Sequence, residues 1–196
     1  MNRSIGVYLL IGFNIVGYLL EKSGGEAFLA QFALMPLHQG FAPWQLVTYA
    51  FLHDPENLAH IFFNMFGLWM FGRDLEYVFG TRRFLAIYFA SVLAAACTQI
   101  VVTTLMNNPE PTIGASGGVF GILLAFAVLF PRRIIMLLIP PVPLPAWLFV
   151  TLYGLLELFM GASGVQGGVA HFAHLGGMLG AGLMLAMLRA QRRIEE

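Results

Sequence analysis

The chain has 196 residues, of which 59% are hydrophobic and only 10% charged, and its ten Lys and Arg residues balance ten Asp and Glu residues. An ordinary soluble domain is about 25% charged. This composition excludes a disordered chain and a basic nucleic-acid-binding protein, and the single cysteine, Cys97, excludes an internal disulfide. We therefore expect a one-domain integral membrane protein that binds no nucleic acid.

Six apolar segments are predicted to be membrane-spanning helices, which makes the expected fold class an all-α polytopic membrane protein. A helix needs about 17 to 25 mostly apolar residues to cross a bilayer. The first segment could instead be a signal peptide, but no small-residue cleavage site follows it, so an uncleaved span is favoured. In chain order the segments are Ile5–Leu20, Leu58–Phe71, Phe84–Met106, Ser116–Phe130, Trp147–Met160 and Val169–Leu188.

Two connecting segments are too apolar to be simple turns. The first, residues 21–57, is expected to form short helices in the outer interface, with Trp44 and Tyr49 at headgroup depth. The second, Ile134–Pro145, contains four prolines, which remove hydrogen-bond donors and break helices. We expect it to be a connector at the membrane surface.

The positively charged residues divide unequally between the predicted loops. Cytoplasmic loops of membrane proteins carry an excess of Lys and Arg. If the N-terminus is cytoplasmic, nine of the ten positive residues fall on that side and only Lys22 falls outside. This division predicts six spans with both termini in the cytoplasm. The nine are Arg3, Arg73, Arg82, Arg83, Arg132, Arg133, Arg189, Arg192 and Arg193.

Polar residues in the second, fourth and sixth predicted spans fall in one layer of the membrane. His60 and Asn64 are four residues apart, and His171 and His174 three apart, so each pair shares one face of a helix. Together with Ser116 they lie within roughly 10 Å of the outer ends of their helices, at about 1.5 Å per residue. If the three helices are neighbours, these groups form one polar site that opens to the outside.

Small residues indicate that the fourth and sixth spans are in contact. Gly117 and Gly121 on one helix, and a face that includes Gly176, Gly177 and Gly180 on the other, allow close approach of the backbones. A serine becomes a nucleophile when a base within about 2.6 to 3.2 Å takes its proton, and the resulting oxyanion needs donors.

The polar layer supplies these groups. Either His171 or His174 can be the base for Ser116. The Ser116 N–H, with His60 and Asn64, can supply the donors.

Each of these residues also has an ordinary structural interpretation. Ser or Asn in a span commonly bonds to a neighbouring helix or to its own helix, and glycine pairs commonly pack helices. Two imidazoles without a nearby carboxylate or thiolate make a poor zinc site, so we expect no metal and no cofactor. The spacing Gly114-x-Ser116-x-Gly118 matches a nucleophile elbow, but that motif needs a preceding strand. The structural interpretations lose weight because all must hold at once in one layer.

Three motifs on alternate spans resemble the rhomboid family of intramembrane serine proteases. They are the Gly-Ala-Ser-Gly run at 114–117, the His-Ile-Phe-Phe-Asn run at 60–64 and the Ala-His-Leu-Gly-Gly run at 173–177. One departure is visible, because Gln45 follows Trp44 where the family often has Arg. The resemblance implies a single rhomboid protease membrane domain over residues 1–196, of the minimal six-helix bacterial type.

The resemblance also implies roles for the site residues. Ser116 would be the nucleophile and His174 the general base, as a dyad with no carboxylate. His60, Asn64 and Gly114 would bind the oxyanion or the substrate. The enzyme would cleave transmembrane segments of other membrane proteins near the outer face of the bilayer, and a client-binding rhomboid-like protein without activity is the alternative.

Further expectations concern the surroundings of the site. Substrate would enter past the fifth span, under a flexible cap formed by Gly161–Gly168. Glu157 would either snorkel to the outer interface or line the access gap. Glu76 would bond to loop backbone, and Cys97 would be a small packing residue. Short tails without a transit peptide favour a bacterial plasma membrane.

Overall fold

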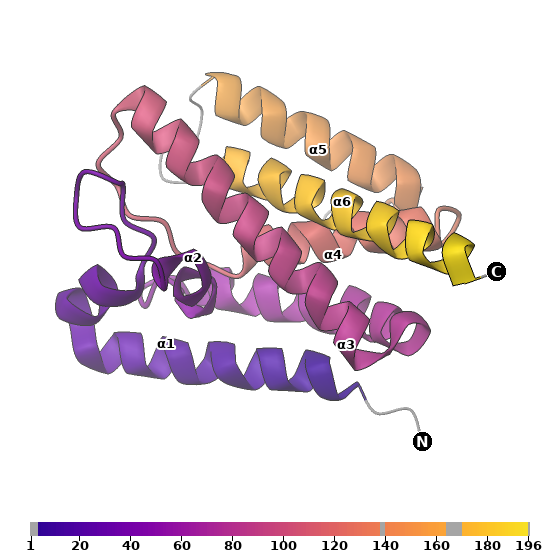
Figure 1. Ribbon diagram of the computed structural model, residues 1–196, viewed down its shortest axis with the longest axis horizontal. Coiled ribbons are helices and arrows are strands. Elements are labelled where there is room, and N and C mark those ends of the chain that lie inside the picture. The colour runs from indigo at the N-terminus through magenta and orange to yellow at the C-terminus, as the bar shows by residue number, and fades with distance from the viewer. Residues whose placement is uncertain (1–3, 138–139, 164–169, 196) are drawn as a thin grey trace.

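The structure is a computed structural model that describes residues 4–137, 140–163 and 170–195 (Figure 1). Most of it is helical, with one small antiparallel hairpin. The elements are α1 (Ile5–Phe32), α2 (Gln45–Thr48), the 3₁₀ turn η1 (Tyr49–Phe51), α3 (Leu58–Met106), α4 (Ser116–Leu129), β1 (Ile134–Met136), β2 (Pro143–Pro145), α5 (Ala146–Ser163) and α6 (His171–Glu195).

Four of the described helices, α1, α3, α5 and α6, are long and apolar enough to cross a membrane, and α4 is an apolar helix of 14 residues. Helix α3 has 49 residues but breaks at Gly80, whose φ of 74° is a backbone conformation that glycine adopts without strain. The helix that contains the second predicted span therefore continues past Phe71 to this break. With α3 counted as two segments, six long helical segments follow the predicted order.

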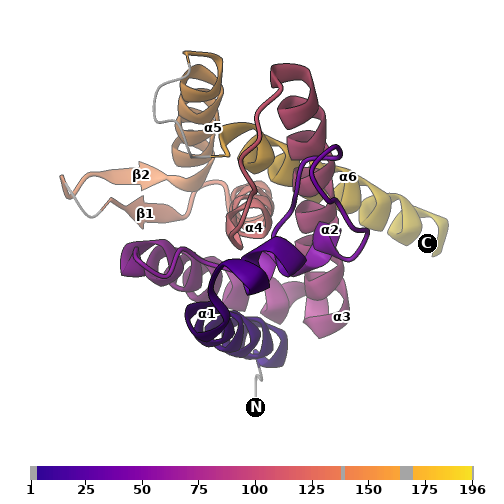
Figure 2. The same ribbon diagram turned by 90° about the vertical axis from the view of Figure 1, so that its left-hand side faces the viewer.

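Helix α4 lies at the centre of the bundle, against α3, α5 and α6 (Figure 2). A Cβ atom on Gly117 would lie 2.5 Å from that of Ala95 on α3. A Cβ atom on Gly177 would collide with the backbone of Gly117 itself. The backbones of α4 and α6 are thus in direct contact, which confirms the prediction drawn from their small residues.

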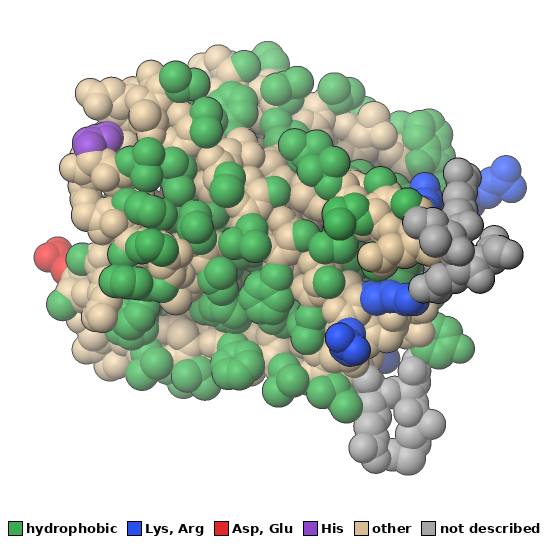
Figure 3. Space-filling model, in the orientation of Figure 1, with side chains coloured by type: hydrophobic (Ala, Val, Ile, Leu, Met, Phe, Trp, Pro, Cys, Tyr) green, Lys and Arg blue, Asp and Glu red, His purple; other side chains and the backbone are tan. Residues whose placement is uncertain are grey.

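The surface is apolar around the bundle, and positive charge gathers at one end. Large apolar side chains such as Phe13, Leu155, Phe159 and Leu183 are exposed. On the face shown in Figure 3, the Lys and Arg side chains lie at the end of the bundle where both termini lie in Figure 1. We call this the terminal end. An apolar belt with charge at its end supports an integral membrane protein.

The first long connection differs from its prediction in two respects, because α1 continues into it and because Tyr49 is buried. Helix α1 bends at Gly25 and continues to Phe32, and α2 and η1 follow as the expected short helices. Trp44 is 54% exposed, but Tyr49 is 2% exposed and its hydroxyl donates to the carbonyl of Val92 at 2.8 Å. The prediction of Tyr49 at headgroup depth is wrong, since its ring belongs to the core.

The later connection, Ile134–Pro145, contains the hairpin, in which Ile134 pairs with Pro145 and Met136 with Pro143. The proline-rich sequence predicted a segment without helix, and none is present in its described part. Of the expected cap, residues 161–163 belong to α5, and residues 164–168 lie outside the described residues. Cys97 is exposed on the surface of α3, so its prediction as a packing residue is wrong.

Glu76 joins the two halves of α3 to the start of α1. Its carboxylate accepts the backbone N–H groups of Gly6 at 2.7 Å and Val7 at 2.9 Å, and the Thr81 hydroxyl at 2.6 Å. The prediction that Glu76 bonds to backbone is confirmed, but the backbone is the start of helix α1 and not a loop. A negative side chain at this position satisfies amides that have no partner within their own helix.

Candidate active site

Ser116, the predicted nucleophile, is the first residue of α4, and the backbone before it turns sharply at Gly114. Gly114 has a φ of 123°, which residues with a side chain rarely adopt, and a Cβ atom there would lie 2.8 Å from His60 Nε2. Its N–H donates to the carbonyl of Tyr49 at 3.0 Å. Gly114 therefore makes room in the site, whereas its own N–H is already used in a backbone bond.

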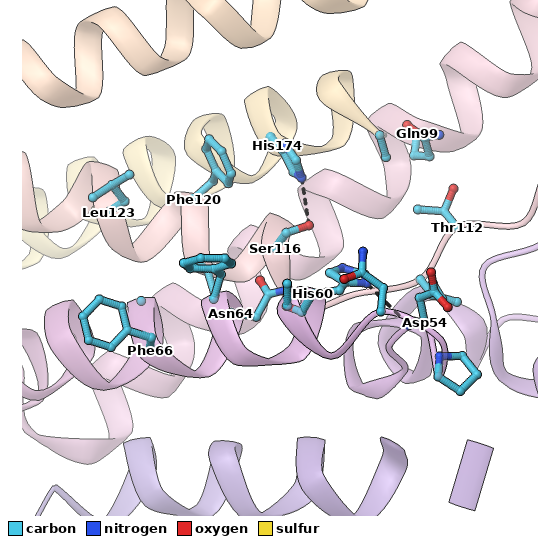
Figure 4. A pocket seen from close by; sticks show the side chains of 18 of the residues that line it. Asp54, His60, Asn64, Phe66, Gln99, Thr112, Ser116, Phe120, Leu123 and His174 are labelled. Carbon is cyan, nitrogen blue, oxygen red and sulfur yellow. Dashed lines mark hydrogen bonds between the residues drawn. The ribbon is translucent and has the colours of Figure 1, made fainter. Parts of the chain in front are cut away.

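His174 of α6 reaches Ser116 directly. Its Nε2 lies 2.8 Å from the Ser116 Oγ (Figure 4). The imidazole ring stacks on the ring of Phe120, with centroids 4.2 Å apart and planes 5° apart. The ring is thus held in one plane with one nitrogen facing the hydroxyl, which is the geometry that general-base catalysis requires.

The other nitrogen of His174 faces Glu157 of α5. Its Nδ1 lies 2.8 Å from Glu157 Oε2, and the carboxylate side chain is 4% exposed. A carboxylate accepts hydrogen bonds, so His174 carries its proton on Nδ1 and directs the lone pair of Nε2 at Ser116. Both predictions for Glu157, snorkelling and lining the access gap, are wrong. The prediction of a dyad with no carboxylate is also wrong in one respect, because the Glu157 carboxylate is hydrogen-bonded to His174.

His171 is the other histidine that the sequence allowed as the base. Its Nδ1 lies 2.7 Å from the same Oε2 of Glu157, and its buried Nε2 has no hydrogen-bond partner among the described residues. In the described part of the chain, Ser116 is bonded by His174 and not by His171. The geometry therefore favours His174 as the base, in agreement with the resemblance.

The predicted oxyanion donors line the same space. The Asp54 N–H points at His60 Nδ1 at 3.4 Å, which leaves the proton of the neutral ring on Nε2, beside Gly114. Asn64 Nδ2 donates one proton to the His60 carbonyl at 2.9 Å and has a second N–H available. His60 and Asn64 can each offer one donor, together with the Ser116 N–H in the first turn of α4.

These polar groups lie in the middle of a cavity of about 1550 Å³, between an apolar part and a part lined by Asp54, Gln99 and Thr112 (Figure 4). Figure 4 shows His60, Asn64, Ser116 and His174 around it. The apolar part of the lining comes from α3, α4, α5 and β1, with Leu137 directly after β1. Its apolar lining includes Phe63, Phe66, Met70, Phe71, Phe120, Leu123, Ile135, Met136, Leu137, Phe149 and Tyr153.

His53, in the connection before α3, lies behind His60, with ring centroids 5.0 Å apart. The side chain of His53 is fully buried, and this burial, together with the neighbouring His60, lowers the pKa of His53 to about 3. The ring is therefore neutral at physiological pH. Its backbone N–H donates to the buried Glu21 carboxylate at 2.7 Å.

One cluster has the residue types of a metal site. Glu157, His171 and His174 each offer a ligand atom, all within 4.8 Å of one another. Zinc enzymes use such a set. Here both imidazoles instead direct Nδ1 at one carboxylate oxygen, so hydrogen bonds account for the cluster. The argument against zinc from a missing carboxylate was wrong, and the expectation of no metal stays a prediction.

Sequence reasoning missed the contact between Glu157 and the histidines. The available signal was a single carboxylate within an apolar span, which is costly to bury without a partner. An apolar helical bundle that places a serine hydroxyl against a stacked imidazole defines a membrane protein with the side-chain arrangement of a serine hydrolase.

Comparison with known proteins identifies the family. The Rhomboid domain family matches residues 40–192, and the chain belongs to this family. It is 30% identical over 179 residues to Rhomboid protein 1, mitochondrial, of Saccharomyces cerevisiae, which covers 88% of this chain and 50% of the yeast protein. The chain thus spans about half the length of this relative.

Other relatives come from a bacterium and a plant. The chain is 36% identical over 124 residues to Rhomboid protease GluP of Bacillus subtilis, over 59% of this chain and 23% of that protein. It is 32% identical over 164 residues to RHOMBOID-like protein 12, mitochondrial, of Arabidopsis thaliana, over 75% of this chain and 47% of that protein.

Proposed function

We propose that the protein is an intramembrane serine endopeptidase that cleaves transmembrane segments of other membrane proteins. The observation that carries this proposal is the 2.8 Å contact between Ser116 Oγ and His174 Nε2, in a cavity that has an apolar part beside these residues. The name of the Bacillus relative, Rhomboid protease GluP, supports the same activity.

The reaction follows from the positions of the donors and acceptors. His174 Nε2 takes the proton of Ser116 as Oγ attacks the scissile carbonyl carbon. The oxyanion that forms is stabilised by N–H groups of His60, Asn64 and Ser116. His174 then protonates the leaving amine, and water hydrolyses the acyl-enzyme in a second round of the same steps.

The walls of the cavity favour an apolar substrate segment. Phe63 and Met70 of α3, Phe149 of α5 and Met136 of β1 line its apolar part. The segment would enter between the first half of α3 and α5. A helix hides its peptide bonds, so the substrate unwinds locally before cleavage, and helix-breaking residues near the cut assist this step.

We further propose a single domain over residues 1–196 with six spans, of which α3 supplies two, and with both termini in the cytoplasm. The unequal division of positive residues supports this orientation. Ser116 then faces the outer side of the membrane. The bacterial plasma membrane remains a prediction from sequence, because the relatives include both mitochondrial and bacterial proteins.

The proposal is tested with purified protein and a test transmembrane substrate in detergent. We expect cleavage by the parent chain and by Ser23→Ala, whose serine is exposed on α1, and none by Ser116→Ala or His174→Ala. A fluorophosphonate probe should label the parent at Ser116. Cleavage that survives Ser116→Ala would overturn the proposal, and a folded parent that neither cleaves nor labels would indicate a client-binding protein.

A further inference from the structure

We infer that Glu157 is a positioning residue for His174, so that the site works as a serine, histidine and glutamate triad instead of a dyad. This inference rests on the proposed function. Glu157 does not touch Ser116 and acts through the imidazole. Three elements each supply one member, α4 the serine, α6 the histidine and α5 the glutamate.

The geometry is continuous from the carboxylate to the hydroxyl. Glu157 Oε2 lies 2.8 Å from His174 Nδ1, and His174 Nε2 lies 2.8 Å from Ser116 Oγ. The two bonds use opposite sides of one ring, whose plane is fixed by Phe120. A neutral imidazole has a single proton, and the carboxylate holds that proton on Nδ1.

The environment makes this contact effective. Glu157 is 4% exposed and His174 is 8% exposed. Electrostatic interactions are stronger in such a water-poor site than in solution. When His174 takes the serine proton it becomes an imidazolium, and the adjacent carboxylate stabilises that charge. Without the carboxylate, the ring could carry its proton on Nε2, which would then face Ser116 as a donor and could not accept its proton.

His171 provides a control for a merely structural role. It bonds to the same Glu157 oxygen at 2.7 Å, and this bond also connects α5 to α6. Substitution of His171 removes one connection between the helices and leaves the Glu157–His174 bond in place. Substitution of Glu157 removes the carboxylate from both histidines. If Glu157 only joined the helices, each substitution would lower the rate only to the extent that it lowered the unfolding temperature.

The test measures kcat and KM for cleavage, the rate of fluorophosphonate labelling and thermal unfolding. We expect Glu157→Gln to lower kcat and the labelling rate by ~10²-fold or more with KM changed less than about threefold. Glu157→Asp, which keeps the charge on a shorter side chain, should recover part of the lost kcat. His171→Ala should stay within about threefold of the parent in kcat even where its unfolding temperature falls.

The outcomes separate this inference from the proposed function. If Ser116→Ala abolishes cleavage but Glu157→Gln and Glu157→Asp both keep parental kcat and labelling, Glu157 has no positioning role. A loss of kcat in Glu157→Gln that only follows its loss of folded protein, as in His171→Ala, would also overturn the inference in favour of a helix connection. If the parent does not cleave the substrate but is still labelled at Ser116, the proposed peptidase function fails. The effect of Glu157→Gln on the labelling rate then still tests the role of Glu157.

Discussion

Glu76 and Glu157 are two carboxylates of the same bundle, each 4% exposed, yet they have different kinds of partner. Glu76 accepts two backbone N–H groups of α1 and the hydroxyl of Thr81, none of which exchanges a proton in a reaction. Glu157 accepts from two imidazoles, one of which contacts Ser116. Because Glu76 and Glu157 are equally buried, burial alone does not reveal the role of a carboxylate. The groups that donate hydrogen bonds to it do.

The largest effect on kcat should come from substitution of Ser116, which belongs to the same hydrogen-bonded group as Glu157. Ser116→Ala should lower kcat by at least ~10³-fold while the unfolding temperature stays close to that of the parent, because only a hydroxyl is removed. Cleavage assays and thermal unfolding on the same preparation provide the check. If the unfolding temperature fell together with activity, Ser116 would have a role in stability, as Glu76 does.

Gly114→Ala should have the next largest effect. The new Cβ atom would lie 2.8 Å from His60 Nε2, and the backbone at φ 123° is strained for alanine. A displacement of the site by about 1 Å can cost ~10²-fold in rate, and we expect a loss of that order in kcat. Gly12→Ala is the control, since nothing lies within 4 Å of its Cβ position. Equal activity of the two variants would contradict the assigned role of Gly114.

Glu76→Ala should affect stability and leave the chemistry intact. It removes the acceptor of three hydrogen bonds to a charged group, for which we expect a loss of about 3 kcal/mol in the free energy of unfolding. Thermal unfolding in detergent measures the loss, and kcat of the folded fraction should match the parent. A lower kcat in fully folded protein would erase the distinction between Glu76 and Glu157.

The smallest effect concerns pH and His53. The pKa of His53 in the fold is about 3, below the ordinary value of 6.5, so its contribution to stability is complete above pH 6.5 and declines as the pH falls toward 3. Between pH 7 and pH 5 the loss is about 2 kcal/mol at most. His53→Phe should reduce the stability difference between these pH values, as measured by thermal unfolding. An unchanged difference would show that His53 is not the responsible group.

Much of this arrangement was predictable from the sequence. The lengths of the apolar segments predicted the order of the helices. Counting residues from the helix ends predicted that Ser116, His60 and His174 lie in one layer. The missed features depend on how helices rotate and pack. Glu157 meets its histidines only because α5 turns that face toward α6, and Tyr49 is buried because its hydroxyl finds the Val92 carbonyl. No periodicity in either segment specifies such a partner.

In the proposed function, the 14 residues of α4 determine how deep in the membrane the chemistry takes place. At about 1.5 Å per residue the helix is about 21 Å long, whereas the hydrocarbon core of a bilayer is about 30 Å thick. Ser116 begins a helix that is shorter than the bilayer core, and it lines the cavity to which α3, α5 and β1 also contribute. In the proposed orientation, hydrolytic water then descends through protein, and the depth of the scissile bond is set by helix length.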